Sequence, residues 1–85
     1  MGPDESLPEL ILYSRAWCHL CEEMLSQLQQ LGVVGLRIEV IDVDGDADLE
    51  CRFGEDVPVL MHGDTELCRH RLDPQRVRAY LADIS

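Results

Sequence analysis

The chain has 85 residues, 46% of them hydrophobic and 28% charged, and a formal net charge of −10. This length fits one globular domain, and the acidic balance argues against nucleic acid, which requires clustered lysine and arginine. The sequence has no apolar run of membrane-spanning length and no signal-peptide pattern at its start, which predicts a cytoplasmic protein that binds no membrane. We expect a flexible tail at 1–8 and one domain at 9–85.

The first half of the domain predicts a strand, a helix and a second strand. Residues 10–13 form a continuous apolar run within 9–14, which is typical of a strand buried on both faces. From 18 to 31 apolar residues recur at helical spacing, and Gly32 then supplies a stop signal. Apolar and charged residues alternate from Leu36, which predicts a strand that continues to about Val43.

The second half predicts a short helix, a hairpin and a final helix. Gly63-Asp64 is a hairpin signal, and Asp73 followed by Pro74 is typical of a helix start. The expected elements are a helix that ends at Phe53 and is capped by Asp46 or Asp48, strands over 57–61 and 65–72, and a helix from Pro74. The order is β-α-β-α-β-β-α, with a parallel, right-handed first crossover and an antiparallel last hairpin.

Two cysteines spaced three apart, Cys18 and Cys21, lie where the first strand gives way to the helical pattern. Unpaired N–H groups and the macrodipole at a helix N-terminus favour a thiolate, which is the form that attacks disulfides. Positions i and i+3 share one helix face, close enough for a disulfide. In a reducing compartment such a pair is more often catalytic or metal-binding than structural.

A strand, a Cys-x-x-Cys at a helix start and a later Val57-Pro58 together resemble the glutaredoxin and thioredoxin superfamily, from Glu9 to Ile84. The run from Cys18 to Cys21 is most similar to a small glutaredoxin-like family with no settled function. The resemblance implies an α/β thioredoxin-like fold of the glutaredoxin type: a mixed four-stranded sheet, in the order 4-3-1-2, with helices on both faces. It also implies a thiol–disulfide oxidoreductase in which Cys18 is the nucleophile and Cys21 the resolving thiol.

The same resemblance implies substrate-binding roles for Arg15, Trp17, His19, Val57 and Pro58. Pro58 matches the family's cis-proline, which turns the backbone of the preceding residue towards the cysteines. Arg15 stands where glutaredoxins usually carry lysine, and either stabilises the thiolate and meets a substrate carboxylate or is a solvated surface residue. Trp17 either shields the sulfurs, forms a docking surface or packs on the domain. His19 either favours the thiolate when protonated or is a polar residue of the first turn.

Glutaredoxins place a Gly-Gly pair and an acidic residue after the hairpin, where the backbone holds glutathione. The matching stretch here, 66–73, contains no glycine. Asp73 remains at the helix start, while Arg69 and Arg71 are either contacts for an acidic partner or exposed strand charges. We expect no bound cofactor or metal, glutathione as a candidate co-substrate, a monomer, and a disulfide-containing protein or small thiol as the partner.

Two other classes of function remain open at this point. A metal or iron–sulfur module would use the four cysteines and three histidines, although closed zinc sites usually show two Cys-x-x-Cys pairs and this chain has one. A non-catalytic redox sensor or adaptor would keep the scaffold as a binding surface. Cys51 and Cys68 are interpreted as small buried side chains, with a second disulfide or a redox-regulatory role as the alternative.

Overall fold

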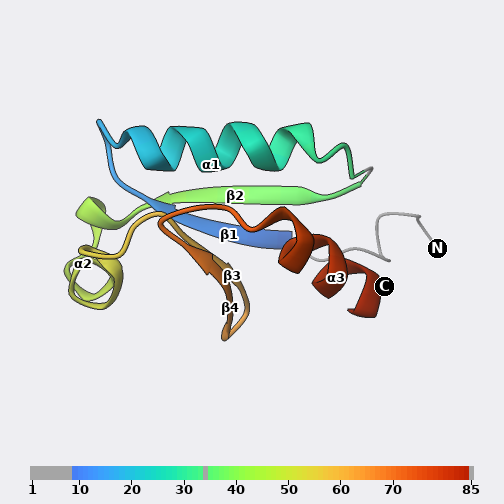
Figure 1. Cartoon of the computed structure of the whole chain (residues 1–85). Coiled ribbons are helices and arrows are strands. Elements are labelled where there is room, and N and C mark those ends of the chain that lie inside the picture. Colours follow the sequence, from blue (N-terminus) through green and yellow to red (C-terminus); the bar gives the residue numbers. More distant parts are fainter. Residues whose placement is uncertain (1–8, 34, 85) are drawn as a thin grey trace.

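The computed structural model describes residues 9–33 and 35–84, so the predicted tail at 1–8 lies outside the described residues. The helices and strands follow one another in the predicted order, with one additional 3₁₀ turn (Figure 1). They are β1 (Glu9–Ser14), α1 (His19–Gln30), β2 (Arg37–Asp42), η2 (Val43–Gly45), α2 (Ala47–Phe53), β3 (Val59–His62), β4 (Thr65–Arg69) and α3 (Pro74–Ile84). Within the described ranges, no helix is long and apolar enough to cross a membrane.

The sheet has four strands in the order β2-β1-β3-β4. β1 pairs with β2 in parallel and with β3 antiparallel, and β3 pairs with β4 antiparallel. This mixed sheet and its strand order confirm the predicted topology. Because β1 is central, the loop that follows it leaves the middle of the sheet, and this loop carries the two cysteines to the start of α1.

Helices cover both faces of the sheet, each over its own apolar cluster. Successive residues of a strand point to opposite faces, so Leu60 joins one cluster and its neighbour Val59 the other. The larger cluster unites β1, β3 and β4 with the buried sides of α1 and α3, and the smaller one packs Phe53 of α2 and Val43 of η2 against the opposite face. The loop between β1 and α1, which carries the cysteines, is therefore anchored by both apolar clusters.

The helix ends follow the chemistry that the sequence predicts. Gly32 has a φ of +68° just after α1, in the left-handed region that glycine adopts without steric cost. The Asp46 carboxylate accepts the N–H groups of Asp48 and Leu49 at the start of α2. The Asp73 carboxylate accepts the N–H of Arg76 in the first turn of α3.

Three strands differ from the prediction at their ends. β3 begins at Val59 and ends at His62, whereas the prediction placed this strand at 57–61. Val43 belongs to η2 rather than to the second strand, and it is fully buried under α2. β4 ends at Arg69, three residues before the predicted end at Leu72, because His70 turns into the left-handed region with a φ of +67°. The pairing between β3 and β4 also shifts register at Leu60 and Met61, which is a bulge that sequence alternation does not reveal.

Candidate functional site

Cys18 is the N-cap of α1. Its backbone is extended, with φ −102° and ψ 109°, and its Sγ accepts the N–H of Cys21 at 3.2 Å. Serine, threonine, aspartate or asparagine usually fill this role, because the cap must accept one of the unpaired N–H groups of the first turn. Here a half-buried sulfur does so. The positive end of the helix dipole therefore lies at a nucleophilic atom that solvent can reach.

Cys21 lies one turn further along the helix and differs in its environment. Its exposed fraction is 5%, and burial, followed by its hydrogen bond with Cys18, raises its pKa from 9.0 to about 12. A backbone hydrogen bond with Arg15 acts in the opposite direction but is outweighed. Both cysteines are free thiols in this structure. At neutral pH Cys21 therefore keeps its proton, and the two sulfurs are chemically distinct.

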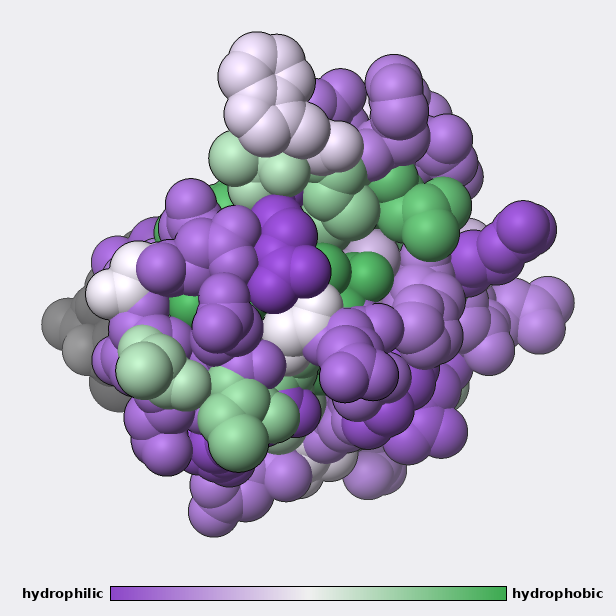
Figure 2. All heavy atoms as spheres, turned by 90° about the vertical axis from the view of Figure 1, so that its left-hand side faces the viewer, coloured by the Kyte–Doolittle hydropathy of each residue, from purple (hydrophilic) through white to green (hydrophobic). Residues whose placement is uncertain are grey.

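Trp17, immediately before Cys18, projects into solvent. Its exposed fraction is 97% and its φ is +64°, an unusual backbone conformation for a bulky residue. The indole does not pack on the domain, which removes one of the three alternatives for this residue. Leu20, on the first turn of α1, is 40% exposed. Figure 2 views this end of the molecule, where a few hydrophobic side chains gather on a face that is mostly hydrophilic.

Arg15 connects the cysteine loop to the opposite layer. Its guanidinium donates to both carboxylate oxygens of Asp44, at 3.0 and 3.2 Å, and lies 3.8 Å from the Glu50 carboxylate. A side chain on Gly54 would bring its Cβ within 3.0 Å of this guanidinium, so glycine leaves the space that Arg15 occupies. Arg15 thus holds the loop against η2 and α2, while its charge also acts on the Cys21 sulfur.

The Val57–Pro58 peptide is cis, which confirms the expectation drawn from the resemblance. Pro58 is fully buried and Val57 half-buried, and the Pro58 carbonyl accepts the N–H of His70 at 2.8 Å. His19 is exposed at the first position of α1. Tyr13 lies on the other face of the sheet, where its ring stacks on Phe53 with centroids 4.3 Å apart.

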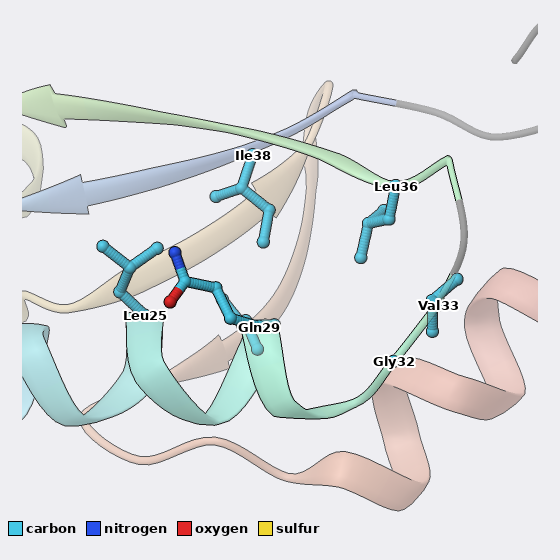
Figure 3. A pocket seen from close by; sticks show the side chains of 7 residues that line it. Leu25, Gln29, Gly32, Val33, Leu36 and Ile38 are labelled. Atoms are coloured by element: carbon cyan, nitrogen blue, oxygen red, sulfur yellow. The ribbon is translucent and has the colours of Figure 1, made fainter.

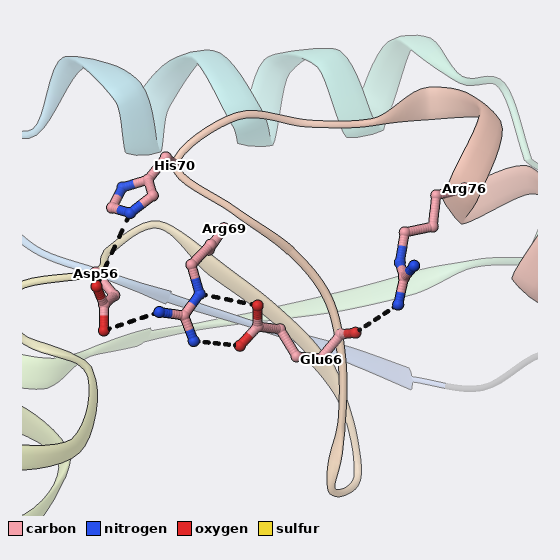
Figure 4. Close-up of polar contacts among 5 residues, drawn as sticks. All are labelled: Asp56, Glu66, Arg69, His70 and Arg76. Carbon is pink, nitrogen blue, oxygen red and sulfur yellow. Dashed lines mark hydrogen bonds and ion pairs between the residues drawn. The ribbon is translucent and has the colours of Figure 1, made fainter.

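The connection from β4 to α3 forms a second wall beside α1. Arg69 is held between the carboxylates of Asp56 and Glu66, and His70 lies near the beginning of α1, with Nε2 3.9 Å from Asp56 (Figure 4). His70 occupies the glycine-free stretch, yet it adopts the left-handed backbone that glycine usually supplies. A groove of about 340 Å³ separates this connection from the first half of α1.

The remaining cysteines divide into two cases. Cys68 is buried, its Sγ accepts the N–H of Asp73 at 3.5 Å, and burial raises its pKa. Cys51 is exposed on α2, so its interpretation as a buried side chain is wrong: this short surface helix turns Phe53 inwards and Cys51 outwards. No group of three or more Cys, His, Asp or Glu side chains placed to hold a metal occurs among residues 9–33 and 35–84.

A further groove of about 320 Å³ lies between α1 and β2 (Figure 3). Leu25 and Gln29 of α1 face Ile38 and Leu36 across it, and Gly32 and Val33 close one end. This groove extends to the last residues of α1. Because an α-helix rises about 1.5 Å per residue, the groove is separate from the end of the helix that carries Cys18. It does not contribute to the candidate site.

Sequence reasoning missed two features of this site. Asp44, Glu50 and Gly54 surround Arg15, although 29 residues separate Arg15 from Asp44. The left-handed turn at His70 has no sequence signal, because histidine does not specify that conformation. The missing glycines of the 66–73 stretch did point to this connection as a departure from the glutaredoxin pattern.

Solved structures define the class of fold. The chain resembles thioredoxin 1 from Thermosipho africanus, with a TM-score of 0.58 and 20% identity, covering 88% of this chain and 96% of that one. It also resembles buckwheat glutaredoxin in a glutathione complex, with a TM-score of 0.54 and 23% identity over 94% of this chain and 73% of that one. The fold is thioredoxin-like.

More similar proteins identify the family. The model of the Glutaredoxin-like domain (DUF836) matches residues 9–82, and the chain belongs to this family. An uncharacterized protein of Mycobacterium tuberculosis is 32% identical over 83 residues, which cover 91% of this chain and 86% of that protein. A solution structure from Nitrosomonas europaea has a TM-score of 0.77 and 39% identity, and covers 87% of this chain and 91% of that one.

Proposed function

We propose that the chain is a thiol–disulfide oxidoreductase in which Cys18 attacks and Cys21 resolves. The Cys18 thiolate attacks one sulfur of a substrate disulfide, the substrate S–S bond breaks, and the leaving sulfur takes a proton. Cys21 then loses its proton and attacks Cys18 Sγ, which releases the second substrate thiol and leaves a Cys18–Cys21 disulfide. The substrate gains two electrons and two protons, and the protein loses them.

The observation that carries this proposal is the asymmetry of the two sulfurs. Cys18 Sγ accepts an N–H group at the helix start and Cys18 is only half-buried, whereas Cys21 is 5% exposed with a pKa raised to about 12. Only the thiolate is nucleophilic, so the first attack falls to Cys18. Cys21, one turn along the same helix, is positioned for the second step.

The rest of the cycle requires a reductant. A dithiol protein, or two molecules of a low-molecular-weight thiol, reduces the Cys18–Cys21 disulfide by the reverse exchange. We propose that the protein acts as a cytoplasmic monomer without a resident cofactor, with glutathione as a candidate co-substrate. Arg15, Trp17, His19, Val57 and Pro58 are proposed to border the substrate.

Two variants and one control test the function. Cys18→Ser is expected to abolish the reduction of a disulfide substrate, whereas Cys21→Ser accumulates a mixed disulfide that intact-mass measurement detects. Cys51→Ser removes an exposed thiol outside the site and is expected to keep full activity. An undiminished rate in Cys18→Ser would show that the assignment is wrong. A wild-type protein that reduces no disulfide would support the adaptor alternative instead.

A further inference from the structure

Arg71 is the one arginine whose side chain has no intramolecular partner within the described residues. The chain has seven arginines and no lysine. The other six all make contacts: Arg15 with Asp44, Arg37 with a further group, Arg52 over the Phe53 ring, Arg69 with Asp56 and Glu66, Arg76 with the Glu66 carbonyl, and Arg78 with the Leu31 carbonyl. The guanidinium of Arg71 is thus an available cation in a chain of net charge −10.

The backbone fixes where Arg71 begins. Its N–H donates to the Arg69 carbonyl at 2.7 Å, which closes a tight turn around the left-handed His70. The His70 N–H in turn donates to the Pro58 carbonyl at 2.8 Å. Non-glycine residues in this conformation persist only where surrounding contacts impose it, and they cluster at functional sites. The turn therefore ties the position of Arg71 to Pro58, which the site already includes.

Arg71 lines the groove of about 340 Å³ beside the cysteine helix. The other lining residues come from the first three turns of α1 and from the β4–α3 connection: Leu20, Glu23, Met24, Gln27, His70 and Leu72. Of these residues, Leu20 is the nearest to Cys18 in the sequence, two positions after it, so the groove lies along the first part of the helix that Cys18 caps. It is an open surface groove that combines apolar side chains with polar ones and with one cation, Arg71, which suits an extended chain.

The local charge differs in sign from that of the whole chain. Residues 69–78 contain four arginines and one acidic residue, Asp73, a charge of +3, and the carboxylates of Asp56 and Glu66 that pair with Arg69 reduce this local charge to +1. At physiological ionic strength charges act over about 8 Å, so a ligand in the groove experiences Arg71 more than the distant acidic residues. Glu23 lines the same groove, which disfavours a ligand with several adjacent negative charges. The groove therefore favours a single carboxylate placed at Arg71.

We propose that this groove binds one acidic side chain of a protein substrate, on an extended segment whose cysteine reacts with Cys18. The inference rests on the proposed function, which supplies the disulfide at Cys18. The groove follows α1 from Leu20 to Gln27, over which the helix rises about 10 Å, and an extended segment covers about 3.3 Å per residue, so the acidic residue lies within about three positions of the reacting cysteine. Trp17, which is exposed immediately before Cys18, is proposed to contact the apolar part of the same segment.

Peptides test this assignment in a reaction and in a binding measurement. The first peptide has an uncharged sequence and carries one cysteine as a mixed disulfide with cysteamine, with a glutamine three positions before this cysteine and another three positions after it. The second peptide is identical except that glutamate replaces both glutamines. We expect the wild type to reduce the glutamate peptide about fivefold faster, which is the upper range for one exposed ion pair. Arg71→Ala is expected to bring the ratio of the two rates to about one. Arg78→Ala removes the same charge from the same segment and is expected to keep the ratio.

The binding measurement does not depend on the chemistry. The same peptides with serine in place of cysteine are titrated into the protein, and the fluorescence of Trp17, the one tryptophan of the chain, reports binding. Tighter binding of the glutamate peptide, lost in Arg71→Ala and kept in Arg78→Ala, supports the groove even if no variant reduces a disulfide. Equal binding of the two peptides by the wild type, or a preference that persists in Arg71→Ala, overturns it. If Arg71→Ala slows the reduction of glutathione disulfide as much as it slows the reduction of the glutamate peptide, the proposal is also overturned, in favour of a site for a small thiol.

Discussion

Alkylation of the four cysteines should separate Cys18 from Cys21 by a large factor. Iodoacetamide reacts with the thiolate, and the pKa of Cys21 is raised from 9.0 to about 12. At neutral pH a pKa of about 12 in place of 9.0 lowers the thiolate fraction of Cys21 about a thousandfold. The 5% exposed fraction of Cys21 slows the reaction further. We therefore expect Cys18 and the exposed Cys51 to react first, and Cys21 only as the pH approaches 12.

The assay is time-resolved alkylation of the reduced protein, followed by digestion and mass measurement of each cysteine peptide. Cys51 serves as the internal reference because it is exposed on α2. Cys18→Ala tests the cause: it removes the hydrogen bond but leaves burial, the larger contribution, so Cys21 should remain slow. Reaction of wild-type Cys21 within about tenfold of Cys51 at neutral pH would refute the asymmetry on which the mechanism depends.

Three substitutions test the loop that carries the site. Arg15→Ala should lower the free energy of unfolding, measured by urea denaturation, by up to about 1 kcal/mol, because its ion pair with Asp44 is partly exposed. Asp44→Asn should lower it by a similar amount, and a much smaller loss in Asp44→Asn would contradict the pairing. Gly54→Ala should cost about 1–3 kcal/mol, since its Cβ would lie 2.5 Å from the Glu50 carbonyl oxygen; an unchanged melting temperature would show that this contact relaxes freely. Trp17→Gly should change stability by no more than about 1 kcal/mol, because the indole buries nothing and the strain relieved at positive φ offsets the entropy of glycine. A larger loss would mean that the indole packs in solution.

The fold was predictable because its signals are local and consistent with one another. The buried run at 10–13, the helical spacing after Cys18, the capping Asp46 and the Asp73-Pro74 start each specify one element, and each lies where the pattern predicts. The strand order came from the resemblance rather than from periodicity, since alternation along a strand does not say which strand is its neighbour. The bulge and the early end of β4 depend on tertiary contacts that no single segment encodes.

The placement of the two cysteines was predictable, but the contacts around them were not. Spacing and position identified Cys18 and Cys21, because a helix start has the same unpaired N–H groups in any protein. The partners of Arg15 were not predictable, since Asp44 approaches it only when α2 and η2 pack on the opposite face. The groove at Arg71 likewise depends on the backbone of His70, a conformation for which the sequence offers no glycine.

The reduction potential of the Cys18–Cys21 pair tests the central claim most directly. The protein is equilibrated in thiol–disulfide buffers of graded potential, and the fraction with a Cys18–Cys21 bond is measured by trapping and peptide mass, with Cys21→Ser as the control. An exchanging dithiol should titrate between about −180 and −270 mV, the range from protein disulfide isomerase to thioredoxin. A pair that forms no mutual disulfide, or one that stays oxidised below about −300 mV as structural disulfides do, would contradict the account.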